Sequence, residues 1–172
     1  MNSNPDIRHI LVAHDFSEFS DAALDYGLAL AAKFGARVTV VHAYDVPSLG
    51  APEVLILATD WTKQFSVVAR ESLDKVVAQA RERGAAVEPV LRRGAAWREV
   101  VTVADELKAD LIVVGTEGRR GVTRALLGSV AERIVRMATC PVLVARHPTA
   151  KASADAAEPG STTATRRASR GS

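Results

Sequence analysis

The sequence predicts an α/β protein with an open, doubly wound, five-stranded parallel sheet and helices on both faces. Two observations carry this prediction. Short apolar runs alternate along the chain with helical stretches of about ten or more residues, which is the order of a parallel sheet with right-handed crossovers. The first run, residues 10–13, is continuously apolar, as expected for a strand buried on both faces. With 172 residues, the chain has room for one domain with a sizeable core.

The expected strands are apolar or β-branched runs, at residues 10–13, 38–43, 87–91, 111–114 and 141–145. The expected helices carry apolar side chains at helical spacing, over residues 18–34, about 60–83, 97–107 and from about 128 onward. Ser17 is the expected N-cap of the first helix, and Gly35 follows its end. Pro89 indicates that the third strand lies at an edge, because proline cannot donate a ladder hydrogen bond.

Several side chains are expected to have structural roles. The spacing of Val130, Ile134 and Met137 predicts that they face the core from the last helix. His42 is expected to be a hydrogen-bonded strand residue, and His14 is expected to be structural or solvent-facing rather than catalytic. The four histidines show no metal-ligand spacing and the single cysteine offers no second thiolate, so we expect no metal site on the protein.

Charge and composition divide the chain. Residues 1–145 hold 17 basic and 18 acidic side chains, whereas residues 146–172 hold five basic and two acidic ones. A nearly neutral folded part argues against nucleic acid as a partner. The C-terminal part contains no Leu, Ile, Val or aromatic residue, so we expect a disordered basic tail over residues 147–172. Residues 1–6 are expected to be a disordered N-terminus, leaving one domain at residues 7–146.

The compartment expected from the sequence is the cytoplasm. The longest apolar runs are about five residues, far below the roughly 18 needed to span a bilayer, so no membrane association is expected. No basic-then-apolar leader is apparent. The single cysteine, Cys140, excludes an internal disulfide framework and fits a reducing compartment.

A glycine pattern after the fourth expected strand is a candidate phosphate-binding site. Gly115 and Gly118 are separated by two residues, Thr116 and Glu117, and a further nine residues separate Gly118 from Gly128 and Ser129. The two earlier glycines would let backbone approach a ligand, and the free N–H groups of a helix starting near Gly128 favour phosphate. The pattern is neither a P-loop nor the GxGxxG dinucleotide fingerprint. A plain strand-to-helix loop, with glycines for turning and arginines for solubility, remains the alternative.

Together with this pattern, further segments resemble the universal stress protein family. They are residues 10–12, 15–18, 40–43 and 140–144, and the resemblance covers residues 7–146. Its most specific element, G-x2-G-x9-G-[ST], occurs in the ATP-binding branch of the family. The resemblance therefore implies an adenine nucleotide alpha hydrolase-like fold and ATP binding, with Mg²⁺ held through the phosphates.

The resemblance also implies roles for particular residues. Asp15 corresponds to the acid that lies against the nucleoside, and Ala43 to a position whose backbone contacts adenine. The turn and helix start that face ribose and phosphate correspond to Gly115, Thr116, Gly118, Gly128, Ser129 and Val130. Two departures stand out: His14 follows Ala13 where the family often has a Pro-containing pair, and Ala43 is smaller than the usual Val. Capping of the turn before the first helix is the alternative role for Asp15.

The expected function is that of a nucleotide-dependent stress-response regulator that is not an enzyme, with no catalytic residues. The resemblance also implies a homodimer through the last strand, at Val142, Leu143 and Val144. Two alternatives stay open: a slow ATPase or nucleotidyl-transfer enzyme, and an interaction module without nucleotide. The sequence leaves open whether the nucleotide is ATP, cyclic AMP or another adenine nucleotide, and which protein lies downstream.

Overall fold

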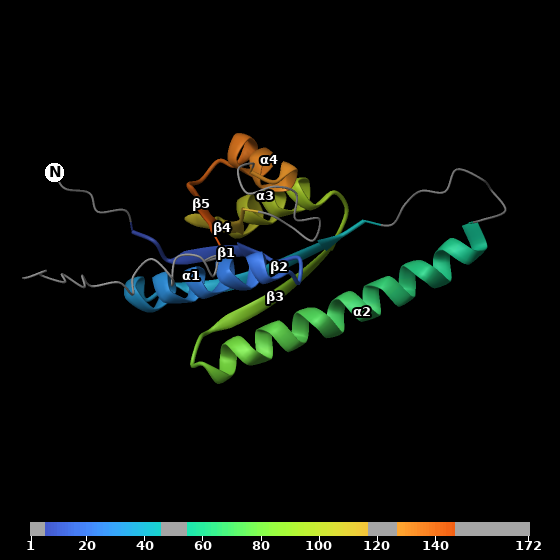
Figure 1. Ribbon diagram of the computed structural model, residues 1–172, viewed down its shortest axis with the longest axis horizontal. Helices are drawn as coiled ribbons and strands as arrows, with labels where there is room; N and C mark the ends of the chain where they lie inside the picture. Colours follow the sequence, from blue (N-terminus) through green and yellow to red (C-terminus); the bar gives the residue numbers. More distant parts are fainter. Residues whose placement is uncertain (1–5, 46–54, 117–126, 147–172) are drawn as a thin grey trace, which may run out of the picture.

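Five parallel strands form one sheet in the computed structural model, which describes residues 6–45, 55–116 and 127–146, with the side chains of residues 55–62 left out (Figure 1). The elements in chain order are β1 (His9–Ala13), α1 (Glu18–Phe34), β2 (Arg37–Tyr44), α2 (Leu55–Glu82), β3 (Val87–Arg93), α3 (Ala96–Leu107), β4 (Leu111–Gly115), α4 (Ser129–Met137) and β5 (Val142–Ala145). The strand order is β3-β2-β1-β4-β5, and every neighbouring pair is parallel. The predicted fold class is confirmed, and β3 with Pro89 is an edge strand as predicted.

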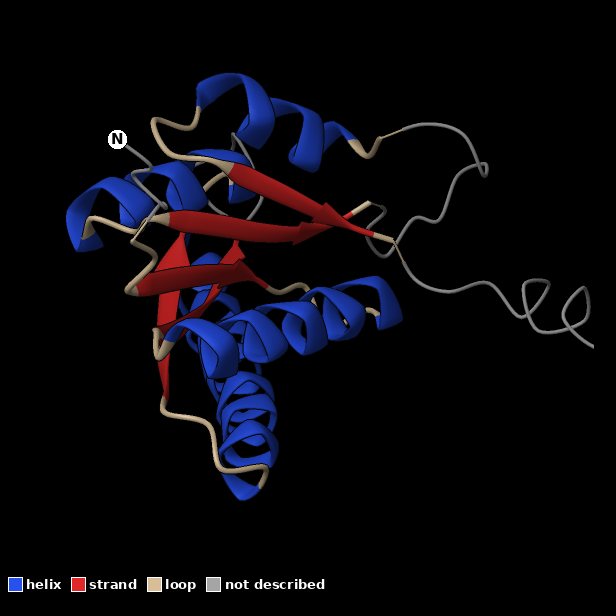
Figure 2. Ribbon diagram, turned by 90° about the vertical axis from the view of Figure 1, so that its left-hand side faces the viewer, coloured by secondary structure: helices blue, strands red, loops and turns tan. Residues whose placement is uncertain are grey.

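The sheet lies between two layers of helices (Figure 2). Helices α1 and α2 cover one face, and α3 and α4 cover the other. Alternate residues of β1 serve the two layers: Ile10 and Val12 belong to the core under α1 and α2, whereas Leu11 belongs to the core under α3 and α4. This double burial explains why the strand is continuously apolar.

Helix α1 lies very close to the centre of the sheet. Gly27 permits this approach, because a Cβ atom there would lie 2.7 Å from Cγ2 of Val12. Ser17 caps the helix: its side chain accepts from the backbone of Ser20, whose side chain accepts from the backbone of Ser17. Gly35 ends the helix in the left-handed conformation at φ 67°. Both predicted helix boundaries are confirmed.

Two helices differ from the sequence expectation. Helix α2 starts at Leu55 rather than near residue 60, because the preceding Leu- and Ala-rich residues are strong helix formers and extend an existing helix at little cost. In α4, Ala131 and Ile134 are buried, whereas Val130 is 39% and Met137 is 55% exposed. The predicted inward face of Val130, Ile134 and Met137 is therefore wrong in two of its three positions. None of the described helices is long and apolar enough to cross a membrane.

Candidate functional site

The strand order reverses between β1 and β4, which makes the carboxyl ends of these two strands a topological switch point. From β1 the chain passes into α1 on one face, and the helix that follows β4 in the sequence, α4, lies on the other face. Ligands of doubly wound sheets bind where strand order reverses in this way. Asp15 follows the end of β1, and Gly115 and Thr116 follow one another at the end of β4, so all three lie at this edge.

The turn from β1 into α1 holds Asp15 in a defined orientation. Its Oδ1 accepts a hydrogen bond from the Ser17 hydroxyl at 2.6 Å and another from the Ser17 N–H at 3.2 Å. The side chain is partly exposed. Asp15 thus caps the turn, which was the alternative role from the sequence. Both bonds fix the carboxylate at this edge of the sheet, so the capping role and a ligand-binding role are compatible.

Phe16, the next residue, has a left-handed backbone at φ 65°, which costs a residue with a Cβ atom roughly 1–2 kcal/mol. Its ring packs against the ring of His42 with centroids 4.2 Å apart, and against His14 at 5.5 Å. The sequence analysis did not single out Phe16. Its strained conformation directly after Asp15 shows that packing against β2 shapes this turn.

His14 is buried beneath the turn, where its ring bonds Asp21 of α1 at 3.1 Å and accepts from the Phe16 N–H at 3.2 Å. Burial lowers the pKa of His14, and the nearby Asp21 carboxylate acts in the opposite direction. The Nδ1 atom of His42 donates to the backbone oxygen of His14 at 2.7 Å, as expected for a hydrogen-bonded strand residue. The structural expectation for His14 is confirmed, although it is buried rather than solvent-facing.

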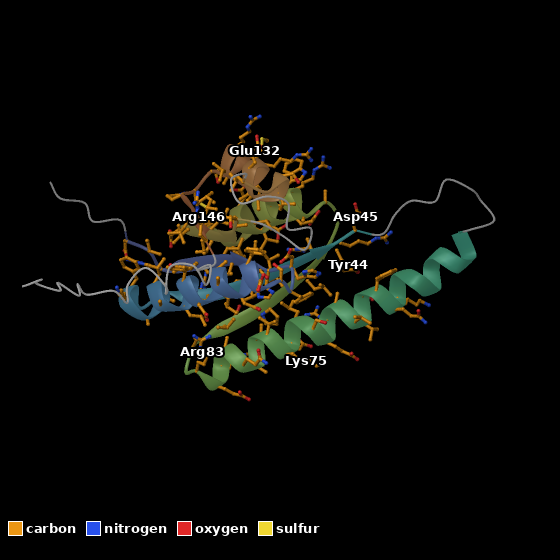
Figure 3. All side chains as sticks on the ribbon, viewed as in Figure 1. Tyr44, Asp45, Lys75, Arg83, Glu132 and Arg146 are labelled. Atoms are coloured by element: carbon orange, nitrogen blue, oxygen red, sulfur yellow. The ribbon has the colours of Figure 1, made fainter. Side chains whose placement is uncertain are left out.

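Ala43 lies beyond the end of β1 on the neighbouring strand. In the β1–β2 register, Ala13 is opposite Val41, so Ala43 is two positions further along. Ala43 is partly buried, and the chain continues to Tyr44 and Asp45 where β2 leaves the sheet (Figure 3). This is the position that the resemblance assigns to adenine.

Gly115 has a packing role that the sequence analysis missed. A Cβ atom there would lie 2.8 Å from the backbone oxygen and 2.9 Å from the carbonyl carbon of Phe19. The start of α1 therefore requires glycine at this position, whether or not a ligand does. Only a three-dimensional contact reveals this reason, since Phe19 and Gly115 are far apart in the sequence.

The start of α4 is tied to the end of β4. The Gly128 N–H donates to the Thr116 oxygen at 2.7 Å, and the Thr116 N–H donates to the Ala145 oxygen at 3.0 Å. Gly128 is the N-cap of α4 and supplies no capping side chain, while Ser129 is exposed in the first turn. Since first-turn N–H groups have no partner inside a helix, this arrangement presents backbone donors close to the end of β4.

The predicted site residues thus gather at one edge of the sheet, with Ala43 one strand away from the others. Two strand ends and the start of α4 contribute them: Asp15, Gly115, Thr116, Gly128, Ser129 and Val130. Gly118 and the loop arginines lie outside the described residues. Among residues 6–45, 63–116 and 127–146, no three His, Cys, Asp or Glu side chains gather in a way that could hold a metal ion.

The chain is similar to known proteins in sequence and in fold. The model of the universal stress protein family matches residues 6–146. A universal stress protein of Methanocaldococcus jannaschii is 36% identical over 145 residues, covering 82% of this chain and 83% of that protein.

Two solved structures of universal stress proteins are similar over nearly their whole length. One, in complex with cAMP, has a TM-score of 0.60 and 27% identity, covering 84% of this chain and 99% of that one. The other, from Archaeoglobus fulgidus in complex with dAMP, has a TM-score of 0.58 and 26% identity, covering 81% of this chain and 98% of that one. With the same five-stranded parallel architecture and a family match over residues 6–146, this chain belongs to the universal stress protein family.

Proposed function

We propose that this protein binds an adenine nucleotide, with ATP as the expected form, and acts as a nucleotide-dependent regulator of the stress response in the cytoplasm. The observation that carries the proposal is the 2.7 Å hydrogen bond between Gly128 and Thr116. It holds the start of α4 against the end of β4, at the point where the strand order reverses. The cAMP and dAMP complexes of similar proteins support an adenine nucleotide as the ligand class.

The phosphates belong at the start of α4. Backbone N–H groups and the positive end of the helix dipole favour anions there, and Ser129 adds a hydroxyl donor. Ser129 is exposed among the described residues, and the glycine at the N-cap has no side chain, which favours contact between a phosphate chain and the backbone. When Mg²⁺ accompanies ATP, it neutralises phosphate charge, and phosphate oxygens supply its ligands.

The nucleoside belongs between the β1–α1 turn and the end of β2. The Asp15 carboxylate, oriented by Ser17, is suited to accept hydrogen bonds from hydroxyl groups of a sugar. Ala43 offers backbone and a small side chain on the adenine side. These residues are proposed to bind and orient the nucleotide, and we expect no rapid hydrolysis of it.

A second copy of the chain is the proposed partner at the β5 edge. The Pro141 and Ala145 oxygens accept hydrogen bonds from the β4 side at 3.0 Å each. Backbone groups alternate in direction along a strand, so the N–H and C=O groups of Val142 and Val144 point to the outer edge of the sheet. Val142, Leu143 and Val144 are only partly buried. An apolar edge strand with outward N–H groups is suited to pairing with its own copy.

Removing one backbone donor tests the phosphate site. Ser129→Pro deletes the N–H and the hydroxyl at the first helical position, where proline is well tolerated, and Gly128 at ψ 146° suits the residue before a proline. We expect ATP binding, measured by titration calorimetry, to weaken by about ten- to hundred-fold, which corresponds to the loss of a hydrogen bond to a charged group.

Two controls sharpen this experiment. Ser129→Ala removes the hydroxyl alone, so it should weaken ATP binding less than Ser129→Pro does. Adenosine carries no phosphate, so Ser129→Pro should leave its affinity unchanged. Wild-type affinity for ATP in Ser129→Pro would show that the phosphates lie elsewhere. Failure of the unmodified protein to bind ATP, cAMP and dAMP would overturn the proposed function.

A further inference from the structure

His14 is buried directly under the turn that carries Asp15, with its side chain 0% exposed. Its two ring nitrogens have different tasks. Nδ1 accepts the Phe16 N–H at 3.2 Å, which requires a lone pair on that nitrogen. In the neutral ring the proton therefore lies on Nε2, which donates to Oδ1 of Asp21 at 3.1 Å. The surrounding contacts thus fit one neutral tautomer.

The backbone of His14 is held as firmly as its ring. Its N–H donates to the Val41 oxygen at 2.9 Å, and its oxygen accepts from Nδ1 of His42 at 2.7 Å. On the other side of Asp15, the Phe16 ring packs against His42 and the Phe16 backbone is left-handed. Asp15 is therefore placed by the two residues beside it, both anchored on β2.

Protonation of His14 would break this arrangement. The added proton goes to Nδ1, where it faces the Phe16 N–H and removes the hydrogen bond that supports the left-handed turn. Among the described residues, Asp21 from α1 and Asp15 from the turn favour the charged ring, and His42 from β2 disfavours it. Burial is the largest influence and lowers the pKa of His14, so the ring is neutral at neutral pH.

We propose that His14 is a positioning residue for the nucleotide site: its neutral form holds the β1–α1 turn so that Asp15 can meet the nucleoside. This inference rests on the proposed function. A proton on His14 and a nucleotide on Asp15 then oppose each other, and by linkage the nucleotide also disfavours protonation of His14. Acidification is therefore expected to release the nucleotide from the site.

The test compares the pH dependence of ATP binding in two proteins. His14→Asn keeps an acceptor for the Phe16 N–H in an Asx turn, and it does not titrate. Calorimetry from about pH 8 to pH 5 spans the range in which ordinary histidine side chains titrate and extends to lower pH. We expect the wild type to lose affinity below the midpoint by up to about tenfold per pH unit, whereas His14→Asn should keep whatever affinity it shows at the alkaline end. Protonation of ATP itself affects both proteins equally.

A second variant is expected to shift the pH midpoint of the affinity loss while leaving the His14 side chain in place. Asp21→Asn keeps an oxygen that accepts from Nε2 but removes the negative charge that favours protonated His14. The acid loss of affinity should therefore shift to lower pH. Asp25→Asn is the matched control, since it removes one carboxylate from the same helix, where Asp25 pairs with Arg83 instead. That control should leave the midpoint in place.

The outcomes separate the two proposals. If wild type and His14→Asn show the same pH profile, or if Asp21→Asn leaves the midpoint unchanged, His14 does not position the site, although nucleotide binding stands. If ATP binds the wild type at no pH, both proposals fall. Because Asp21 is largely exposed, its variant is expected to fold and to decide the question even if His14→Asn does not fold.

Discussion

Gly115 lies where the backbone of α1 passes beside the end of β4. The packing around it leaves no space for a Cβ atom, which would meet the Phe19 carbonyl group. Its backbone is not left-handed, so the requirement is steric rather than conformational. A bulky substitution at Gly115 would disturb the start of α1 and the turn with Asp15 before it tested any contact with a ligand.

Gly115→Ala is therefore expected to lower the free energy of unfolding by about 1–3 kcal/mol, as other overpacking changes do. Urea unfolding followed by circular dichroism measures this value. Gly35→Ala is the comparison, because its surroundings are open and only its φ of 67° opposes a side chain. A Gly115→Ala protein as stable as the wild type would show that α1 can move away without cost.

At the level of whole elements, the start of α1 combines two tasks in Ser17. Its side chain belongs to the capping box with Ser20, and its hydroxyl also donates to Asp15 at 2.6 Å. The stability of the helix and the orientation of the proposed nucleoside contact thus share one residue. Ser20 belongs to the same cap, and its side chain and N–H form hydrogen bonds with Ser17.

Ser17→Ala and Ser20→Ala separate these tasks. Each substitution weakens the cap, and each should lower the free energy of unfolding by about 1 kcal/mol in denaturant titrations. Only Ser17→Ala also removes the donor to Asp15, so only this variant should bind ATP clearly more weakly in calorimetry. Equal affinities in the two variants would argue against orientation of Asp15 by Ser17.

The sequence was sufficient for the strands but not for every helix. A strand that is buried on both faces has a continuous apolar run, as in residues 10–13. Pro89 correctly indicated that β3 is an edge strand. The inward face of α4 was misjudged, because a helix of nine residues offers several equivalent apolar stripes. Small Ala131 allows close packing there, whereas the larger Val130 stays outside.

On the scale of the whole molecule, parallel topology brings the site residues together. All carboxyl ends meet at one edge, so Asp15 after β1 and Gly115 at the end of β4 become neighbours as the sequence predicted. The support beneath them was not foreseeable. The bonds of His14 and the contact of Phe16 with His42 depend on side-chain packing between strands, for which the sequence carries no spacing signal.

The proposed dimer edge is also a property of the whole molecule. Val144→Pro removes an N–H that points away from β4, so the sheet should survive while pairing with a second copy is weakened. We expect sedimentation analysis to show a shift from dimer toward monomer. Val144→Ala loses side-chain packing but keeps the backbone N–H, so it should dimerise more strongly than Val144→Pro does. Identical assembly of both variants and the wild type would place the interface elsewhere.

The bond between Thr116 and Gly128 has a consequence for diversification. It joins both ends of the intervening segment and holds the start of α4 beside the end of β4. Closing a longer segment costs little additional entropy, since the cost grows only with the logarithm of its length. A few residues added between Gly118 and Gly128 should therefore cost little stability, even where they change how a ligand binds.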